Sequence, residues 1–82
     1  MNFQSPHNLR IRRAGPHDAP ALGRLAALDS ALPLSGDILL GEVEGEAAAA
    51  LSLTDGTTIA DPFRPTADLV ELLAMRRGQL AA

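Results

Sequence analysis

Two turn signals divide the middle of this chain into three short segments, and no other feature restricts the fold as strongly. Glu44-Gly45 is a two-residue turn in which Gly45 supplies the positive φ that a tight hairpin requires. Asp55-Gly56 is the second turn signal. The pattern predicts a meander of three antiparallel strands, which span residues 37–43, 46–53 and 57–60.

Four consecutive alanines, residues 47–50, lie in the second of these segments. Alanine by itself favours a helix. However, Gly45 and Asp55-Gly56 bracket the alanines so closely that a helix between them would be too short to be stable. We therefore predict a strand here, with small side chains that allow a helix to pack closely against the sheet.

A strand and a helix are predicted before the meander. Residues 9–13 alternate apolar and basic side chains, which is typical of a half-buried strand. Pro16 suits the first position of a helix, and Asp18 suits the first turn, where it faces the positive end of the helix dipole. Leucines then recur at helical spacing as far as Leu32, and Pro33 ends the predicted helix.

A second helix is predicted after the meander. Thr66 is a suitable N-cap. Arg76 and Arg77 complement the negative end of the helix dipole, and Gly78 is the predicted terminator. The predicted apolar face of this helix consists of Leu69, Val70, Leu72, Leu73 and Leu80.

These elements define the fold class as α/β of the α+β kind. The predicted order is β-α-β-β-β-α, with a mostly antiparallel meander sheet and two packed helices. We expect one domain over residues 9–80 and a flexible N-terminal lead-in over residues 1–8.

The composition excludes several classes of function. The 82 residues contain no cysteine and only two histidines, so we expect no metal site. The net charge is −3 and the only aromatic residues are Phe3 and Phe63, which argues against binding to nucleic acid. The N-terminus lacks the pattern of a signal peptide, and no apolar run approaches the roughly 20 residues that span a bilayer. We therefore expect a cytoplasmic protein without a membrane partner.

Two stretches of the chain resemble a known family. Residues 11–22 read IRRAGPHDAPAL, and residues 39–50 read LLGEVEGEAAAA. The first stretch resembles the strand and helix with which members of the GNAT N-acetyltransferase superfamily begin, and the second resembles their second and third strands. The resemblance covers residues 9–60 and extends more loosely to residue 77. It implies the N-terminal half of a GNAT fold, whose active members take an acetyl group from acetyl-CoA.

The junction before the second helix departs from the family pattern. Active members have a Q/R-x-x-G-x-G/A loop here, whose backbone N–H groups approach the pyrophosphate of acetyl-CoA. In this chain Arg64 can stand for the first position, but Ala67 and Leu69 replace the small positions. Pro65 removes one N–H donor, and Asp68 would place a carboxylate against phosphate. The cofactor-binding residues that the resemblance implies for this degenerate loop are Arg64, Thr66 and Ala67.

Other parts of the family's catalytic site have no counterpart. The chain contains no tyrosine, the residue that often serves as the family's general acid. The segment between the first helix and the second strand is too short for the family's second helix, which usually helps to shape the acceptor site. We therefore expect a truncated GNAT-like domain that has no catalytic residue and no cofactor of its own.

Three groups of charged residues allow both a functional and a structural interpretation. Glu42, Glu44 and Glu46 could supply a general base, or they could form the solvent face of the hairpin, which we favour. His17 belongs to a residue type that often serves as a general acid or base, but we expect it to be exposed in the first turn of a helix. The third group consists of Arg10, Arg12 and Arg13. We expect these side chains to be solvated or paired with the hairpin glutamates rather than to form a binding patch.

We expect the chain to act by association with itself or with another protein. The segment 57–60 would leave an open sheet edge, and the apolar face of the second helix would exceed what one small sheet covers. A symmetric homodimer would address both problems. The alternative is an acyl-CoA-binding protein or N-acetyltransferase whose site is completed across an oligomer. A third interpretation is a subunit that completes a separately encoded partner.

Overall fold

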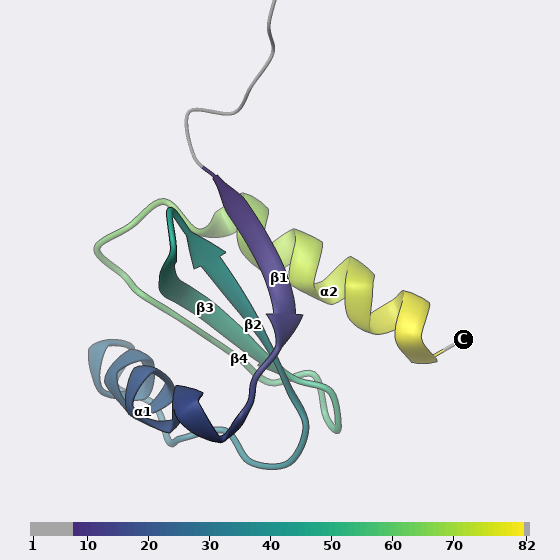
Figure 1. The fold of residues 1–82 in the computed structure, drawn as a ribbon, viewed down its shortest axis with the longest axis horizontal. Coiled ribbons are helices and arrows are strands. Elements are labelled where there is room, and N and C mark those ends of the chain that lie inside the picture. The colour runs from purple at the N-terminus through teal and green to yellow at the C-terminus, as the bar shows by residue number, and fades with distance from the viewer. Residues whose placement is uncertain (1–7, 82) are drawn as a thin grey trace, which may run out of the picture.

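The fold is given by a computed structural model, which describes residues 8–81. A single four-stranded sheet carries all the strands of this part of the chain, in the order β1-β2-β3-β4, and every neighbouring pair is antiparallel (Figure 1). The elements are β1 (Leu9–Arg13), the 3-10 helix η1 (Pro16–Asp18), α1 (Ala19–Leu28), β2 (Ile38–Val43), β3 (Glu46–Ser52), β4 (Thr58–Ala60) and α2 (Ala67–Ala81).

The predicted α+β class and its β-α-β-β-β-α order are therefore confirmed. The predicted flexible lead-in lies outside the described residues except for Asn8, whose carbonyl accepts a hydrogen bond of 2.9 Å from the N–H of Glu44. Asn8 thus extends the ladder between β1 and β2 by one position.

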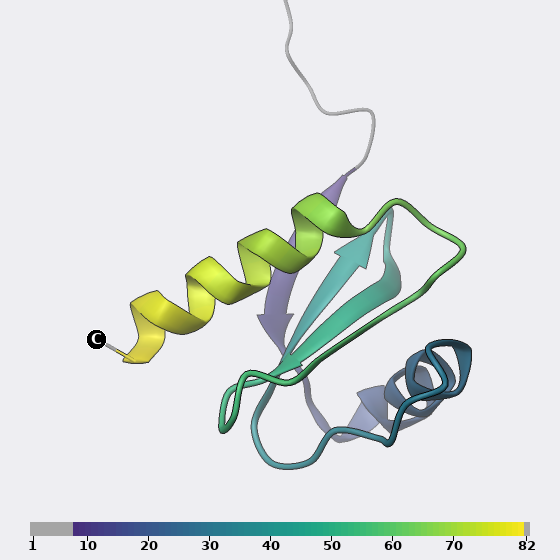
Figure 2. The same cartoon turned by 180° about the vertical axis from the view of Figure 1, so that it is seen from behind.

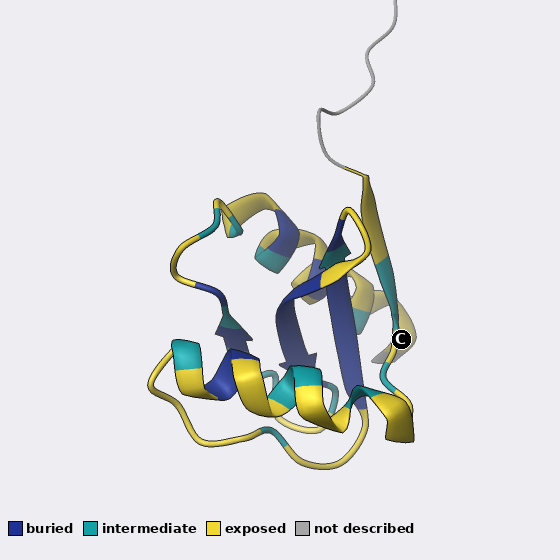
Figure 3. Ribbon diagram, turned by 60° about the vertical axis from the view of Figure 1, so that its left-hand side comes forward, coloured by how far each residue is buried: buried dark blue, intermediate teal, exposed yellow. Residues whose placement is uncertain are grey.

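The two helices cover opposite faces of the sheet. Helix α1 packs on β3 and β4, whereas α2 packs on β2 and β3 from the other side (Figures 1 and 2). Buried residues concentrate in the two central strands (Figure 3). The core is thus divided by the sheet into two layers, and alternate side chains of β2 and β3 serve each layer.

The alanines of β3 contribute to both layers. Ala47 and Ala50 face α1, whereas Ala48 and Ala49 face α2. Two successive residues share a face because the pairing of β2 with β3 shifts between Gly41 and Glu42, which leaves Ala48 as the extra residue of a β-bulge. The predicted close packing of a helix on these alanines is confirmed on both faces, but the bulge has no signal in the sequence.

Helix α1 ends four residues before the predicted end, so the prediction of a helix to Leu32 is wrong. The chain closes the helix after Leu28 by placing Ser30 in the left-handed region, with φ of 51°. The N–H of Ala31 then donates to the carbonyl of Ala26 over 2.9 Å, the hydrogen bond of a Schellman motif. Leu32 consequently lies in the following loop and is 86% exposed.

Helix α2 continues past Gly78 to Ala81, so the prediction that Gly78 ends it is also wrong. A glycine lowers the stability of a helix interior by about 1 kcal/mol relative to alanine, and this is too little to end a helix that tertiary contacts support. One such contact is made by Arg77, whose Nε donates to the carbonyl of Leu53 over 3.2 Å. Within residues 8–81 no helix is both long and apolar enough to cross a membrane.

Candidate functional site

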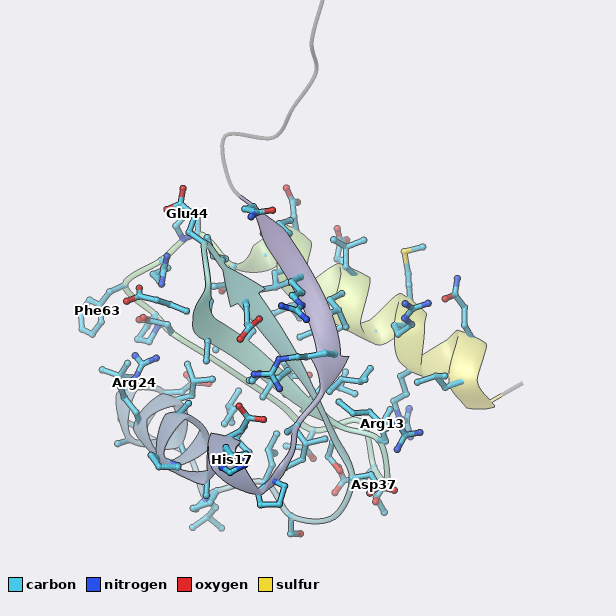
Figure 4. All side chains as sticks on the ribbon, in the orientation of Figure 1. Arg13, His17, Arg24, Asp37, Glu44 and Phe63 are labelled. Atoms are coloured by element: carbon cyan, nitrogen blue, oxygen red, sulfur yellow. The ribbon has the colours of Figure 1, made fainter. Side chains whose placement is uncertain are left out.

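The junction between β4 and α2 contains the residues that the family resemblance implied. Asp61 is buried at the start of this junction, and its carboxylate accepts a hydrogen bond of 2.9 Å from the N–H of Phe63. This Asx turn redirects the chain toward α2. Figure 4 shows Phe63 on the outer side of the loop, pointing away from the sheet, and its side chain is largely exposed.

The structure places Arg64, Thr66 and Ala67 close together at the start of α2, but the guanidinium of Arg64 is already paired with a carboxylate. Nη1 of Arg64 lies 3.1 Å from Oε1 of Glu46. The exposed carboxylate of Asp68 stands in the first turn of the helix, where an anionic ligand would need a positive field. These charges make the junction a weak anion site, and its geometry is that of a helix start tied to the hairpin.

The three hairpin glutamates lie in three different environments. Glu44 is exposed at the tip of the turn with φ of 52°, and Gly45 follows with φ of 83°, so both central residues of the turn are left-handed. Glu46 is exposed and pairs with Arg64. Glu42 departs from the predicted solvent face, because it is half-buried and its Oε2 lies 3.1 Å from Nη2 of Arg12. Its ion pair removes Glu42 as a free general base.

Arg12 stands at the centre of a charged cluster that joins β1, η1 and β2. Its two terminal nitrogens each bind one carboxylate oxygen of Asp18 over 2.8 Å, which is a bidentate pair. Asp18 also accepts a hydrogen bond of 2.7 Å from the N–H of Gly15. Glu42 completes the cluster, so the predicted pairing of these arginines with the hairpin glutamates is confirmed for Arg12. The cluster fixes the entry into α1, and its single cation is paired with two carboxylates, which leaves one net negative charge.

The cluster predicts a pH dependence of stability. The hydrogen bonds from Arg12 and then from Gly15 hold the pKa of Asp18 far below its usual range. A carboxyl group with a lowered pKa in the folded state contributes stability above its unfolded pKa of about 3.9, and this contribution is lost as the pH falls below that value. We expect the thermal midpoint of the wild type to fall between about pH 5 and pH 2.

The variant Asp18→Asn isolates this contribution. We expect a lower thermal midpoint than the wild type at pH 7 and a shallower fall on acidification, because the variant has no carboxylate to protonate. Circular dichroism melts at half-unit pH steps measure both. Equal slopes for the two proteins would contradict the assignment to Asp18. The hydrogen bond from Thr57 likewise lowers the pKa of Asp55, and this contribution persists in the variant.

A groove that the sequence did not predict lies between β1 and α2. Its volume is about 290 Å³, and it is lined by Leu9, Arg10, Ile11, Leu72, Met75, Arg76 and Gln79. The groove exists because α2 packs on β2 and β3 with its first half, while its second half extends beyond the edge of β1 (Figures 1 and 2). Leu69 and Leu73 are buried, whereas Leu72 is 39% and Met75 61% exposed.

A second, smaller recess also borders α2. It has a volume of about 140 Å³ and is lined by Arg13, Asp37, Leu53, Arg77 and Leu80. Arg13 and Asp37 face each other there with 3.7 Å between Nη1 and Oδ2 (Figure 4). In the sequence, this surface was indicated only by the predicted apolar face of the second helix, which was expected to exceed what one small sheet covers. That expectation holds for Leu72 and for Leu80, which is 50% exposed.

The two edges of the sheet differ in how they are protected. The predicted open edge, β4, is three residues long, and Oδ2 of Asp29 accepts a hydrogen bond of 3.1 Å from the N–H of Ala60. At the other edge, the backbone groups of residues 8, 10, 12 and 14, within β1 and at its two ends, face β2. The N–H of Ala14, for example, donates to the carbonyl of Ile38 over 2.9 Å. Leu9, Ile11 and Arg13 therefore direct their backbone groups away from the sheet.

Other candidate residues stand alone. His17 is exposed on η1, as predicted (Figure 4). Among residues 8–81, no group of three or more side chains that commonly bind metals is close enough to hold an ion.

Comparisons with protein-family models, curated proteins and solved structures found no match to this chain. The GNAT relationship therefore stays a prediction from the sequence.

Proposed function

We propose that this chain is a protein-association domain of GNAT-like descent, without acetyltransferase activity of its own. The observation that carries the proposal is the groove between β1 and α2. It combines exposed apolar side chains, Leu72 and Met75, with an unpaired strand edge. Either feature alone is common, but together they form a surface that gains apolar burial and backbone hydrogen bonds from a bound chain.

The groove also indicates which part of the domain takes part in association. The exposed face of α2 lies at the β1 end of the sheet, whereas β4 forms the opposite end. One two-fold interface cannot cover both ends, so the homodimer expected from the sequence would use the β1 end. The N–H of Ala60 at the β4 end is already bound by Asp29.

Light scattering coupled to size-exclusion chromatography tests self-association. We expect a dimer at micromolar concentration and a monomer for Met75→Glu, because a carboxylate in the centre of the apolar face opposes its burial. Leu32→Glu is the matched control, since Leu32 is also an exposed apolar residue but lies in the loop after α1. A wild-type monomer at this concentration would refute the homodimer, and association with another chain would remain.

The alternative function, binding of acyl-CoA at Arg64, Thr66 and Ala67, is tested by isothermal titration with acetyl-CoA. We expect no heat of binding up to millimolar ligand. The pairing of Arg64 with Glu46 and the carboxylate of Asp68 both weaken attraction for a pyrophosphate. Saturation at micromolar ligand that disappears in Arg64→Ala would overturn this expectation and support an N-acetyltransferase completed across an oligomer.

A further inference from the structure

We propose that the open edge of β1 accepts an extended acidic segment of another protein as a fifth strand of the sheet. The inference rests on the proposed association function and specifies the partner of the same groove. It is carried by three features of the described residues: the direction of the β1 backbone groups, the position of α2 beneath the edge, and the signs of the surrounding charges.

The backbone of β1 offers a regular set of hydrogen-bonding groups. In an antiparallel pair, residues alternate between those bonded to the neighbouring strand and those directed away from it. The carbonyl of Asn8 and the N–H of Ala14 bind β2, each over 2.9 Å, which sets the alternation for the whole strand. Leu9 and Ile11 therefore present both N–H and C=O groups to an incoming strand, which is the requirement for strand addition.

Helix α2 provides an apolar surface beneath the position of that strand. An added strand lies about 4.8 Å beyond β1 and directs alternate side chains to each face of the sheet. Its side chains on the α2 side meet Leu72 and Met75, which line the groove and are exposed in the free domain. The incoming segment thus needs apolar residues at every second position, and it covers the part of α2 that the sheet does not reach.

The charges around the edge favour an acidic segment. Arg10 and Arg76 line the groove, and among residues 8–81 neither has a carboxylate within 4.0 Å. Arg12 is paired with two carboxylates, Asp18 and Glu42, so this cluster adds no positive charge and carries one net negative charge. The attraction for an acidic segment therefore comes from Arg10 and Arg76. Side chains of the added strand that point away from α2 lie beside Arg10, and acidic residues suit these positions.

The same charges argue against a second copy of β1 as the added strand. Antiparallel pairing of β1 with itself about Ile11 sets Arg10 of one copy opposite Arg12 of the other on the same face. Like charges directly opposite each other destabilise a strand pair. The preferred occupant is therefore a different chain with alternating apolar and acidic residues, and a homodimer would have to use the helix face without pairing the strands.

The test uses the full chain and two synthetic peptides. The acidic probe alternates valine with glutamate and carries a fluorescent label, and the basic probe has lysine in place of each glutamate. We expect fluorescence anisotropy to show saturable binding of the acidic probe to the protein and no binding of the basic probe. Arg10→Glu together with Arg76→Glu should weaken its binding by about tenfold or more. Arg24→Glu is the control, because Arg24 lies on α1, on the opposite face of the sheet.

Amide hydrogen exchange distinguishes strand addition from other modes of binding. In the free protein we expect rapid exchange at Leu9 and Ile11, whose N–H groups face outward, and slower exchange at Arg10 and Arg12. The acidic probe should slow exchange at Leu9 and Ile11. Binding without this protection, or equal binding of the basic probe, would overturn the proposal.

The failure of this inference differs from failure of the proposed function. A dimer that Met75→Glu dissociates, with no binding of the acidic probe, would leave an association domain whose partner is a second copy. A monomer that binds neither probe would refute the acidic strand and also remove the support for an association function.

Discussion

Leu73→Ala is expected to lower the free energy of unfolding by about 2–5 kcal/mol, the range for truncating a fully buried leucine. Leu73 is 0% exposed and packs within the layer between α2 and the sheet. A domain of this length has a total stability of roughly 4–12 kcal/mol. The substitution therefore removes a large fraction of it, and part of the population should unfold at ambient temperature.

Leu72→Ala is the matched control, because it makes the same chemical change one residue earlier in α2. Leu72 is 39% exposed and lines the groove, so its truncation in the monomer should cost less than about 1 kcal/mol. Urea unfolding followed by circular dichroism at 222 nm measures both variants. Equal losses for the two would contradict the orientation of α2, and with it the groove.

Gly41→Ala is expected to destabilise the protein by about 1–3 kcal/mol, the usual cost of overpacking a core. An added Cβ at Gly41 would lie 2.8 Å from Cδ1 and 2.9 Å from Cγ of Leu69. Leu69 is 2% exposed and has little room to move. Elsewhere in a strand alanine would be slightly favourable, since glycine loses more conformational entropy on folding. A loss of stability in Gly41→Ala would therefore indicate that α2 approaches the sheet closely at this position, whereas a gain would indicate that it does not.

A second substitution and a control separate the contact from other effects. In a Leu69→Ala background, Gly41→Ala should cost much less, because the clashing atoms are absent, and the difference is the coupling between the two sites. Gly23→Ala lies in α1 with nothing within 4 Å of the added Cβ and should be neutral or slightly stabilising. A neutral Gly41→Ala in the wild-type background would mean that α2 lies farther from β2.

The sequence predicts the residues implied by the family resemblance better than it predicts the residues of the groove. Arg64, Thr66 and Ala67 follow one another closely in the chain, so the sequence could place them together at a helix start, and the structure does so. Their charge environment depends on Glu46, which is distant in sequence, and no local pattern indicated that pair. Leu9 and Met75 line the same groove although they lie near opposite ends of the chain. Sequence periodicity describes single elements and does not indicate which elements lie side by side.

The order and type of the elements follow from the amino-acid sequence alone, because turns and periodicity act within a few residues. Gly45 and Gly56 adopt the positive φ that their turns require, and the strands and helices follow between such signals. The ends of the helices and the places where they cross the sheet depend on the folded structure. Gly41 and the buried alanines let α2 approach β2 and β3, and this contact draws the helix away from β1. The groove and its exposed apolar side chains are the result, since packing depends on the fit of surfaces that are far apart in the sequence.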